Sequence, residues 1–314
     1  MTTINTAKGT VDTSQLGFTL MHEHVFTRSP GVFEAWPHLW DAKAQVQRAV
    51  DTFRDLKSAG VDTIVDLTTV DLGRDVPAVA EVAQQVDLNI VMATGVWRNP
   101  PRYFDRRNID PIADLFVRDI EEGMQGTSVR AGIIKMATEP EVDDLNERML
   151  RAGARAHRRT GVPISTHHYV PTECGLRQQD VFESEGVDLS RVVIGHSGDT
   201  ADIEYLEKII GRGSYIGMDR FGTGMLLTTE QRVETVAELC RRGHADRMVL
   251  SHDTNVWMDT IPPELRKERM PDWHFRHISD DILPALRAKG VTEEQIQQMM
   301  VVNPRAIFER QGGY

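Results

Sequence analysis

The chain has 314 residues, of which 40% are hydrophobic and 26% charged, and its formal net charge is −11. This composition is typical of a globular protein with one large core, so we expect a single domain over residues 1–314. The negative charge, with no local basic tract to offset it, excludes nucleic acid and anionic membranes as good partners.

The N-terminal segment, residues 1–15, is polar and lacks the basic-then-apolar pattern of a secretory signal. No apolar run approaches the roughly 18 residues that a membrane span needs. We therefore expect a cytoplasmic protein. The two cysteines, Cys174 and Cys240, form no CxxC motif, so any metal ion must use nitrogen and oxygen ligands.

Short β-rich runs alternate with helical patterns along the chain. We predict eight strands, at residues 18–25, 63–68, 89–96, 131–136, 163–168, 192–197, 214–221 and 248–253. Helical patterns between them include residues 42–59, 143–160 and 230–242. Eight units match an α/β fold of the (β/α)₈ TIM-barrel type better than an open sheet, and no GxGxxG follows the first strand.

The first predicted strand carries His22-Glu23-His24. Residues two apart on a strand face the same side, so both imidazoles can face the barrel interior and bind one cation, while Glu23 points the other way. Histidine pairs are more often satisfied by hydrogen bonds, so this motif alone is a weak indication of metal.

The fourth predicted strand is apolar except for Lys135. A buried lysine must be paired, neutral or chemically modified, although a lysine at a strand end can also extend to solvent. Beside bound cations a neutral amine is favoured, and it can take up CO₂ to form a bridging carbamate.

Histidines also end the fifth and sixth predicted strands. His167 and His168 are adjacent, and periodicity alone does not choose between them as a ligand. His196 follows the sixth strand, where a helix-capping role is the alternative. Imidazole is a common ligand for zinc-like ions, so these residues could form a second cation site.

The eighth predicted strand ends in Ser251-His252-Asp253. Asp253 shares its face with Ser251 and could both bind a cation and accept a proton from attacking water, although helix capping is possible. The segment 254–277 that follows carries Trp257 and Trp273 and is expected to form a wall or lid of the substrate pocket, or else a surface excursion.

These polar residues all fall at the ends of predicted strands. In a TIM barrel the carboxyl ends of the strands converge on the active site. We therefore expect one site containing His22, His24, Lys135, His167 or His168, His196, Asp219 with Arg220, and Asp253.

With these motifs in place, the sequence resembles the phosphotriesterase family of the amidohydrolase superfamily over nearly its full length, from LGFTLMHEHVF (16–26) to NPRAIFE (303–309). Within that family it is most similar to the phosphotriesterase-like lactonases, through GMDRFG (217–222) and the closing NPRAIF.

The resemblance implies a homodimer and a centre of two divalent cations, with Zn²⁺ expected and Co²⁺, Mn²⁺ or Fe²⁺ compatible. It selects His167 over His168 and implies that carboxylated Lys135 and a hydroxide bridge the ions. His22, His24 and Asp253 would then bind one ion, and His167 and His196 the other. The bridging hydroxide attacks the substrate, with Asp253 as its base.

The sequence departs from the lactonase pattern after the third and eighth strands. Trp97 stands where these lactonases usually carry a tyrosine, and an indole donates only N–H. We expect Trp97, Arg220 and Trp257 to contact the substrate; Arg220 could also pair with Asp253 or with Asp219.

The leading hypothesis is the opening of lactones, N-acyl homoserine lactones in particular, which would quench quorum sensing, with organophosphate triesterase activity as a side reaction. The alternatives are a phosphotriesterase, an ester or N-acyl amide hydrolase on the same centre, and a barrel that binds metal or a partner without catalysis.

Overall fold

Nine parallel strands form one curved sheet in the computed structural model, which describes residues 2–309 and 312–314. Its order is β10-β9-β8-β7-β6-β5-β4-β3-β11. The strands are β3 (Thr19–Thr27), β4 (Thr63–Asp66), β5 (Asn89–Gly95), β6 (Ile133–Ala137), β7 (Ile164–His167), β8 (Val192–Ile194), β9 (Tyr215–Met218), β10 (Met248–Leu250) and β11 (Asn255–Met258). The eight predicted strands are confirmed as β3 to β10, and the fold is a (β/α)₈ barrel.

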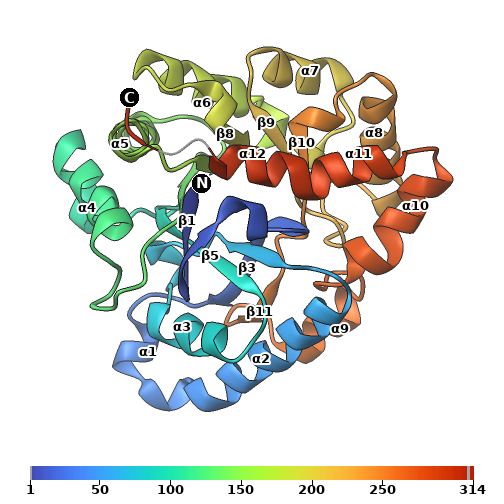
Figure 1. Ribbon diagram of the computed structural model, residues 1–314. Helices are drawn as coiled ribbons and strands as arrows, with labels where there is room; N and C mark the ends of the chain where they lie inside the picture. Colours follow the sequence, from blue (N-terminus) through green and yellow to red (C-terminus); the bar gives the residue numbers. More distant parts are fainter. Residues whose placement is uncertain (1, 310–311) are drawn as a thin grey trace.

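Helices surround the sheet (Figure 1). They are α1 (Val32–Ala35), α2 (Ala42–Ser58), α3 (Val76–Gln84), α4 (Ile109–Glu121), α5 (Asp144–Thr160), α6 (Cys174–Ser184), α7 (Ile203–Gly211), α8 (Thr229–Arg241), α9 (Pro263–Arg269), α10 (Leu283–Ala288), α11 (Glu293–Gln297) and α12 (Asn303–Glu309). The three helices predicted from periodicity are α2, α5 and α8, within one residue at each end. Apolar residues at helical spacing make one face of α2 buried, and this face packs on the barrel core.

The barrel is closed by a strand that is interrupted. β10 pairs with β9, whereas β11 pairs with β3. Between them, the N–H of Asp253 donates to the carbonyl of His22 at 3.0 Å, and the N–H of His24 donates to the carbonyl of Thr254 at 2.8 Å. The closing segment, residues 251–254, therefore lies directly against the His22–His24 motif.

Glu23 holds this closing segment from the other side. Its fully buried carboxylate accepts hydrogen bonds from the Ser251 hydroxyl at 2.8 Å, the His252 ring at 2.6 Å and the Thr254 N–H at 3.0 Å. Glu23 therefore contacts the closing segment instead of joining the two histidines, as predicted. A carboxylate with several donors is a stable buried group, and it fixes the backbone on both sides of Asp253.

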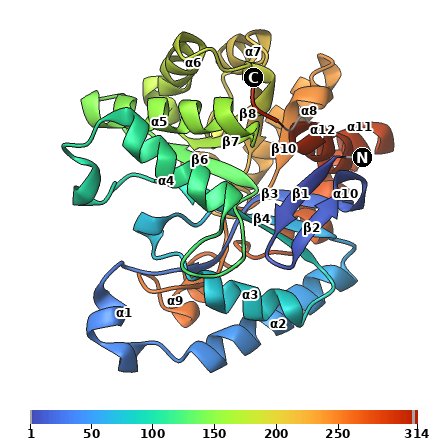
Figure 2. The same ribbon diagram turned by 60° about the vertical axis from the view of Figure 1, so that its left-hand side comes forward.

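The N-terminal polar segment forms a hairpin of β1 (Thr3–Thr6) and β2 (Gly9–Asp12), which the sequence did not predict as strands. Figure 2 shows the hairpin at the side of the barrel. The Asn5 amide donates to the carbonyls of Ile120 and Ala131, at 3.2 and 3.0 Å. The single domain expected over residues 1–314 includes residues 1, 310 and 311, which lie outside the described residues.

The C-terminal residue is bound to the middle of the chain. The Tyr314 hydroxyl lies 2.6 Å from Nε2 of His157, a buried residue of α5, and accepts from the N–H of Asp188 at 2.7 Å. Nδ1 of His157 donates to the carbonyl of Val162 at 2.7 Å. Burial lowers the pKa of His157 to about 4, so the ring is neutral at pH 7.

We expect His157 to make folding stability depend on pH. The unfolded chain binds the proton near pH 6.5 and the folded chain only near pH 4, so stability is fully present above pH 6.5 and is lost as the pH falls toward 4. This difference between the two pKa values contributes at most about 3 kcal/mol to the free energy of unfolding. Urea unfolding of wild type and His157→Gln between pH 7 and 4.5 should show a steeper decline for wild type. Parallel curves would contradict the prediction.

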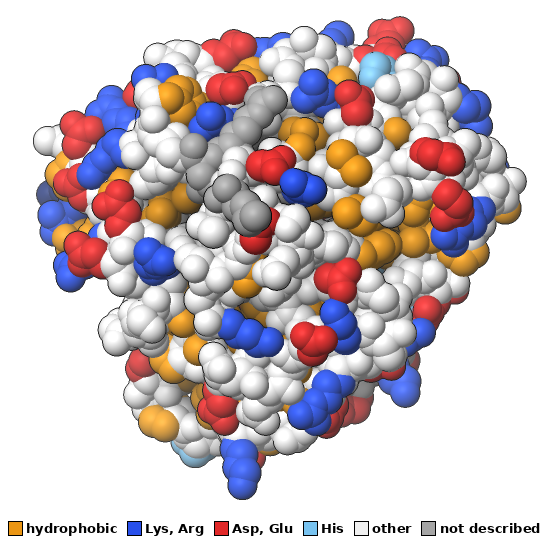
Figure 3. Space-filling model, viewed as in Figure 1, with side chains coloured by type: hydrophobic (Ala, Val, Ile, Leu, Met, Phe, Trp, Pro, Cys, Tyr) orange, Lys and Arg blue, Asp and Glu red, His pale blue; other side chains and the backbone are white. Residues whose placement is uncertain are grey.

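On the face shown in Figure 3, acidic and basic side chains are interspersed. None of the helices within residues 2–309 and 312–314 is long and apolar enough to cross a membrane.

Candidate metal centre

The predicted site residues meet at one end of the barrel. His22 and His24 lie on β3, Lys135 on β6, and His167 ends β7, while His196 and Asp253 come just after β8 and β10. The histidines and Lys135 are buried. The convergence expected from strand position is therefore present in the structure.

One group consists of His22, His24 and Asp253. Oδ1 of Asp253 lies 3.1 Å from Nε2 of His24 and 3.3 Å from Nε2 of His22. One ligand atom from each of the three residues lies within 4.8 Å of the others. Two ring nitrogens and a carboxylate oxygen at this spacing are a donor set suited to a zinc-like cation.

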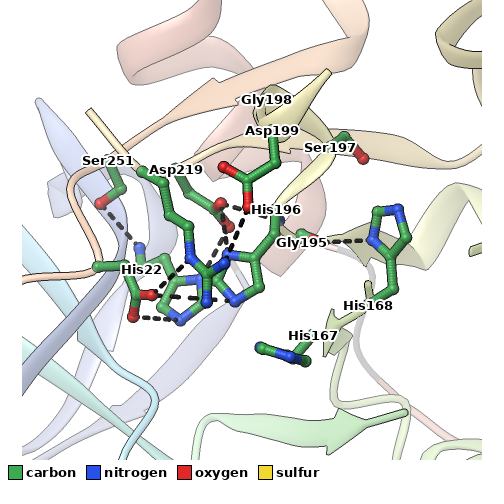
Figure 4. Close-up of polar contacts among 12 residues, drawn as sticks. His22, His167, His168, Gly195, His196, Ser197, Gly198, Asp199, Asp219 and Ser251 are labelled. Carbon is green, nitrogen blue, oxygen red and sulfur yellow. Dashed lines mark hydrogen bonds and ion pairs between the residues drawn. The ribbon is translucent and has the colours of Figure 1, made fainter. Parts of the chain in front are cut away.

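Asp219 fixes the rings of His22 and His196 from behind (Figure 4). Its Oδ2 accepts from Nδ1 of His22 at 2.7 Å, and its Oδ1 accepts from Nδ1 of His196 at 2.9 Å. Metal-binding histidines commonly donate their second nitrogen to a carboxylate, which fixes the tautomer. This arrangement leaves Nε2 of both rings directed toward Asp253.

The sequence placed Asp219 at a strand end but assigned it no such role. The sequence feature that could have indicated this role is Gly217, because a Cβ at this position would lie 2.5 Å from Oδ2 of Asp219. Gly217 thus makes room for a buried carboxylate.

His24 is fixed by a different chain of contacts. Its Nδ1 lies 2.9 Å from the Thr68 hydroxyl, which donates to the buried carboxylate of Asp66 at 2.5 Å. The hydroxyl hydrogen points to Asp66, so Thr68 accepts from His24, and Nε2 of His24 keeps its lone pair. Sequence reasoning did not identify Thr68 or Asp66.

His167 and His168 have separate environments. The ring of His167 lies 4.5 Å from that of His196, centre to centre. His168 is turned away, and its Nδ1 contacts the carbonyl of Gly195 at 2.6 Å (Figure 4). Its other nitrogen contacts the hydroxyl of Tyr205 at 2.9 Å. His168 is therefore satisfied within the fold, while His167 joins the cluster.

Lys135 is fully enclosed instead of reaching solvent. Its Nζ donates to the carbonyl of Thr166 at 3.1 Å and lies 3.4 Å from Nε2 of His22. Burial lowers the pKa of Lys135 to about 8, and the carboxylates of Asp219 and Asp253 oppose this shift. The neutral amine is thus accessible close to neutral pH.

Arg220 joins Asp253 to a second carboxylate. Its Nε donates to Oδ2 of Asp253 at 3.0 Å, and a terminal nitrogen donates to Asp199 at 2.8 Å. Of the two pairings considered from sequence, the structure has the one with Asp253. Burial opposes ionisation of Asp253, but His22, His24, His196 and Arg220 outweigh it and hold its pKa well below the usual range.

The backbone at two of these residues is in the left-handed region. His196 has φ 64° and Asp253 has φ 55°. Non-glycine residues in this region cost about 1 kcal/mol or more and often occur at functional sites. This conformation ends strands β8 and β10 earlier than predicted.

The protonation of the histidines suits cation binding. Burial lowers the pKa of His22, lowers that of His167 to about 3, and holds that of His196 well below its usual value. Cations bind neutral imidazole, and each of these rings already donates its other nitrogen outward. The residues present therefore fit a centre of divalent cations.

A cavity of about 770 Å³ opens onto the cluster. Its apolar walls come from Pro30, Val70, Leu72, Trp97, Pro101, Met258 and Trp273. The segment after the eighth strand does form part of the wall, through Met258 and Trp273. Arg220 lies at the cavity floor beside Asp253.

Two of the tryptophans expected at the substrate have different positions. The indole N–H of Trp97 lies 3.4 Å from Nδ1 of His167, at the cavity. Trp257 instead packs against Phe33 and Trp40, with ring centres 5.8 and 4.9 Å away. The cavity wall next to it is formed by Asn255 and Met258, so the structure gives Trp257 a packing role in place of the expected substrate contact.

Known proteins are similar to the chain over nearly its full length. A model of the phosphotriesterase family matches residues 2–308. A phosphotriesterase homology protein of Mycobacterium tuberculosis is 50% identical over 100% of both chains. An aryldialkylphosphatase of Saccharolobus solfataricus is 39% identical over 96% of this chain and 98% of its own. The solved structure of the phosphotriesterase from M. tuberculosis matches with a TM-score of 0.96 at 50% identity, covering 99% of this chain and 100% of that one.

Proposed function

The chain belongs to the phosphotriesterase family and is a metal-dependent hydrolase. We propose that it opens lactones and that N-acyl homoserine lactones are its substrate class. The cavity carries this proposal. Its apolar walls suit an acyl chain, while its floor presents His22, Lys135, Arg220 and Asp253 to the ring carbonyl.

The family is one of binuclear metal enzymes, and we assign the ligands here to His22, His24, Lys135, His167, His196 and Asp253, with Zn²⁺ as the metal. Two such ions, when bound, lower the pKa of water and polarise the substrate oxygen. With this chemistry supplied, the chain needs no serine or cysteine nucleophile.

Lys135 serves in this proposal as a carbamate. Its neutral amine adds to CO₂, forming an N–C bond and releasing one proton, and the product is a carboxylate in place of an ammonium. Enclosure of Nζ beside His22 supports this assignment, because an anion there balances bound cations, whereas a buried ammonium repels them.

Asp253 is the proposed proton acceptor for the attacking water. Arg220 orients its carboxylate by donating from Nε to Oδ2. Trp97 lines the cavity beside His167, where its N–H can donate to a substrate oxygen but cannot supply a proton as an acid.

A substrate panel tests the proposal. We expect the zinc-loaded protein to hydrolyse γ-lactones with kcat/KM rising about 3- to 4-fold per added acyl CH₂, since each buried CH₂ contributes about 0.8 kcal/mol. Aryl dialkyl phosphates and N-acyl amides are the comparison substrates. Absence of lactone opening, together with efficient cleavage of either comparison class, would refute it.

Triester hydrolysis is the second candidate. The 39% identity to an aryldialkylphosphatase supports it, and the same centre can polarise a phosphoryl oxygen. The panel separates the two candidates by their kcat/KM values.

A further inference from the structure

The four histidines of the cluster are anchored by three different side chains. His22 and His196 share the buried Asp219, and His24 uses the buried Thr68. The anchor of His167 is different, because Nε2 of His167 lies 2.9 Å from Oε2 of Glu139, on the loop after β6.

Glu139 is in turn held by a surface residue. Nε of Arg98 donates to the same Oε2 at 2.7 Å, and the Arg98 side chain is 44% exposed while that of Glu139 is 18% exposed. The Arg98 guanidinium also lies over the Trp97 ring, 5.0 Å from its centre. Two loops, after β5 and after β6, therefore meet at His167.

These contacts distinguish the two nitrogens of the His167 ring. A carboxylate accepts a proton, so Nε2 carries the hydrogen and donates to Glu139. Nδ1 then keeps its lone pair, and the nearest contact described for it is the Trp97 indole N–H, at the long distance of 3.4 Å. Such an N–H is easily displaced by a cation.

We propose that Glu139 is a positioning residue that fixes the His167 ring with Nδ1 directed at the second cation. The affinity for this cation therefore depends on the two surface loops that carry Glu139 and Arg98. The inference rests on the proposed binuclear centre. The histidines of the first ion, His22 and His24, have buried anchors, whereas His167 depends on Glu139, whose partner Arg98 is 44% exposed. Removal of Glu139 therefore weakens the binding of the second ion and leaves the binding of the first ion unchanged.

Zinc titration of chelator-treated protein tests this, with two dissociation constants obtained by competition against a chromophoric chelator. We expect Glu139→Gln to raise the weaker Kd about 10- to 100-fold, the usual cost of losing such a partner, and to leave the tighter Kd within about threefold. Glu139→Ala should have a larger effect, because glutamine still offers an acceptor oxygen. Glu141→Gln, an exposed neighbour, is the matched control and should match wild type.

A third variant reports which nitrogen binds the ion. With Nδ1 as the ligand, Trp97→Phe removes a competing donor, and the weaker Kd should stay constant or fall. If Nε2 were the ligand, the signs would reverse, with Glu139→Gln tightening zinc and Trp97→Phe weakening it. That result, or equal loss of both ions in Glu139→Gln, would overturn the inference.

Thermal unfolding of the metal-free variants separates positioning from folding, because a purely structural role would lower the unfolding temperature without separating the two Kd values. If wild type itself binds only one zinc, the binuclear proposal fails. If wild type binds two zinc ions and Glu139→Gln binds both with the Kd values of wild type, the binuclear proposal stands and only the role of Glu139 is refuted.

Discussion

Asp253→Asn is expected to lower kcat for every hydrolysable substrate by about 10³-fold, within the range that loss of a general base produces. Asparagine has nearly the same shape but replaces one carboxylate oxygen by an NH₂ donor. If that group faces Nε of Arg220, the hydrogen bond that Arg220 now donates to a carboxylate oxygen is lost. The variant loses the proton acceptor and part of the metal-binding charge together.

Steady-state kinetics with zinc content measured on the same samples separates these two losses. Asp259→Asn is the control, because Asp259 lines the same cavity but binds the N–H of Ser29 at 2.6 Å. We expect that variant to stay within about tenfold of wild type, well short of the loss of a general base. Asp253→Asn with two zinc ions and kcat within tenfold of wild type would exclude Asp253 as the base.

Lys135→Met is expected to lower the activity and to raise the folding stability of the metal-free protein. Methionine fills the enclosed space with an unbranched apolar chain but cannot form a carbamate. We expect zinc content to fall from two ions to one or fewer and kcat to fall by more than about 10³-fold, because the proposed bridging ligand is lost.

The metal-free variant should nevertheless be more stable than the metal-free wild type. The folded pKa of Lys135 is about 8, against 10.5 in the unfolded chain, so the buried ammonium costs up to about 3 kcal/mol below pH 8, and this cost disappears above pH 10.5. Urea unfolding at pH 7 measures the gain. Lys208→Met, at an exposed position of α7, should change neither zinc content nor kcat. A destabilised Lys135→Met protein with full zinc content would contradict both parts.

The sequence located β3 to β10, because hydrophobic runs and helical periodicity repeat along the chain, but not β11, which lies in the segment predicted as a wall or lid of the pocket. It placed the ends of several strands incorrectly, and β8, β9 and β10 each end three residues earlier than predicted. Residues 192–197 and 248–253 were predicted as strands, but β8 ends at Ile194 and β10 at Leu250. The cause is the left-handed backbone at His196 and Asp253, which no composition pattern signals for residues other than glycine.

The inward-facing side chains could be predicted and their supports could not. His22 and His24 followed from the two-residue period of a strand. Asp219, Thr68 and Glu139 contact His22, His24 and His167, respectively, from other strands and loops, and such contacts depend on the packed three-dimensional structure. Periodicity did not choose between His167 and His168; the family resemblance selected His167, and the structure shows that His168 instead meets Tyr205.

The interrupted closing strand has a consequence for the order of folding. Its backbone hydrogen bonds join Asp253 to His22 and Thr254 to His24, residues more than two hundred positions apart in the chain. Contacts of such sequence separation carry a high entropic cost and form late. A nascent or partly folded chain therefore lacks the complete cluster, and hydrolytic competence arrives together with barrel closure. Cations that bind only the closed state would in turn slow its reopening.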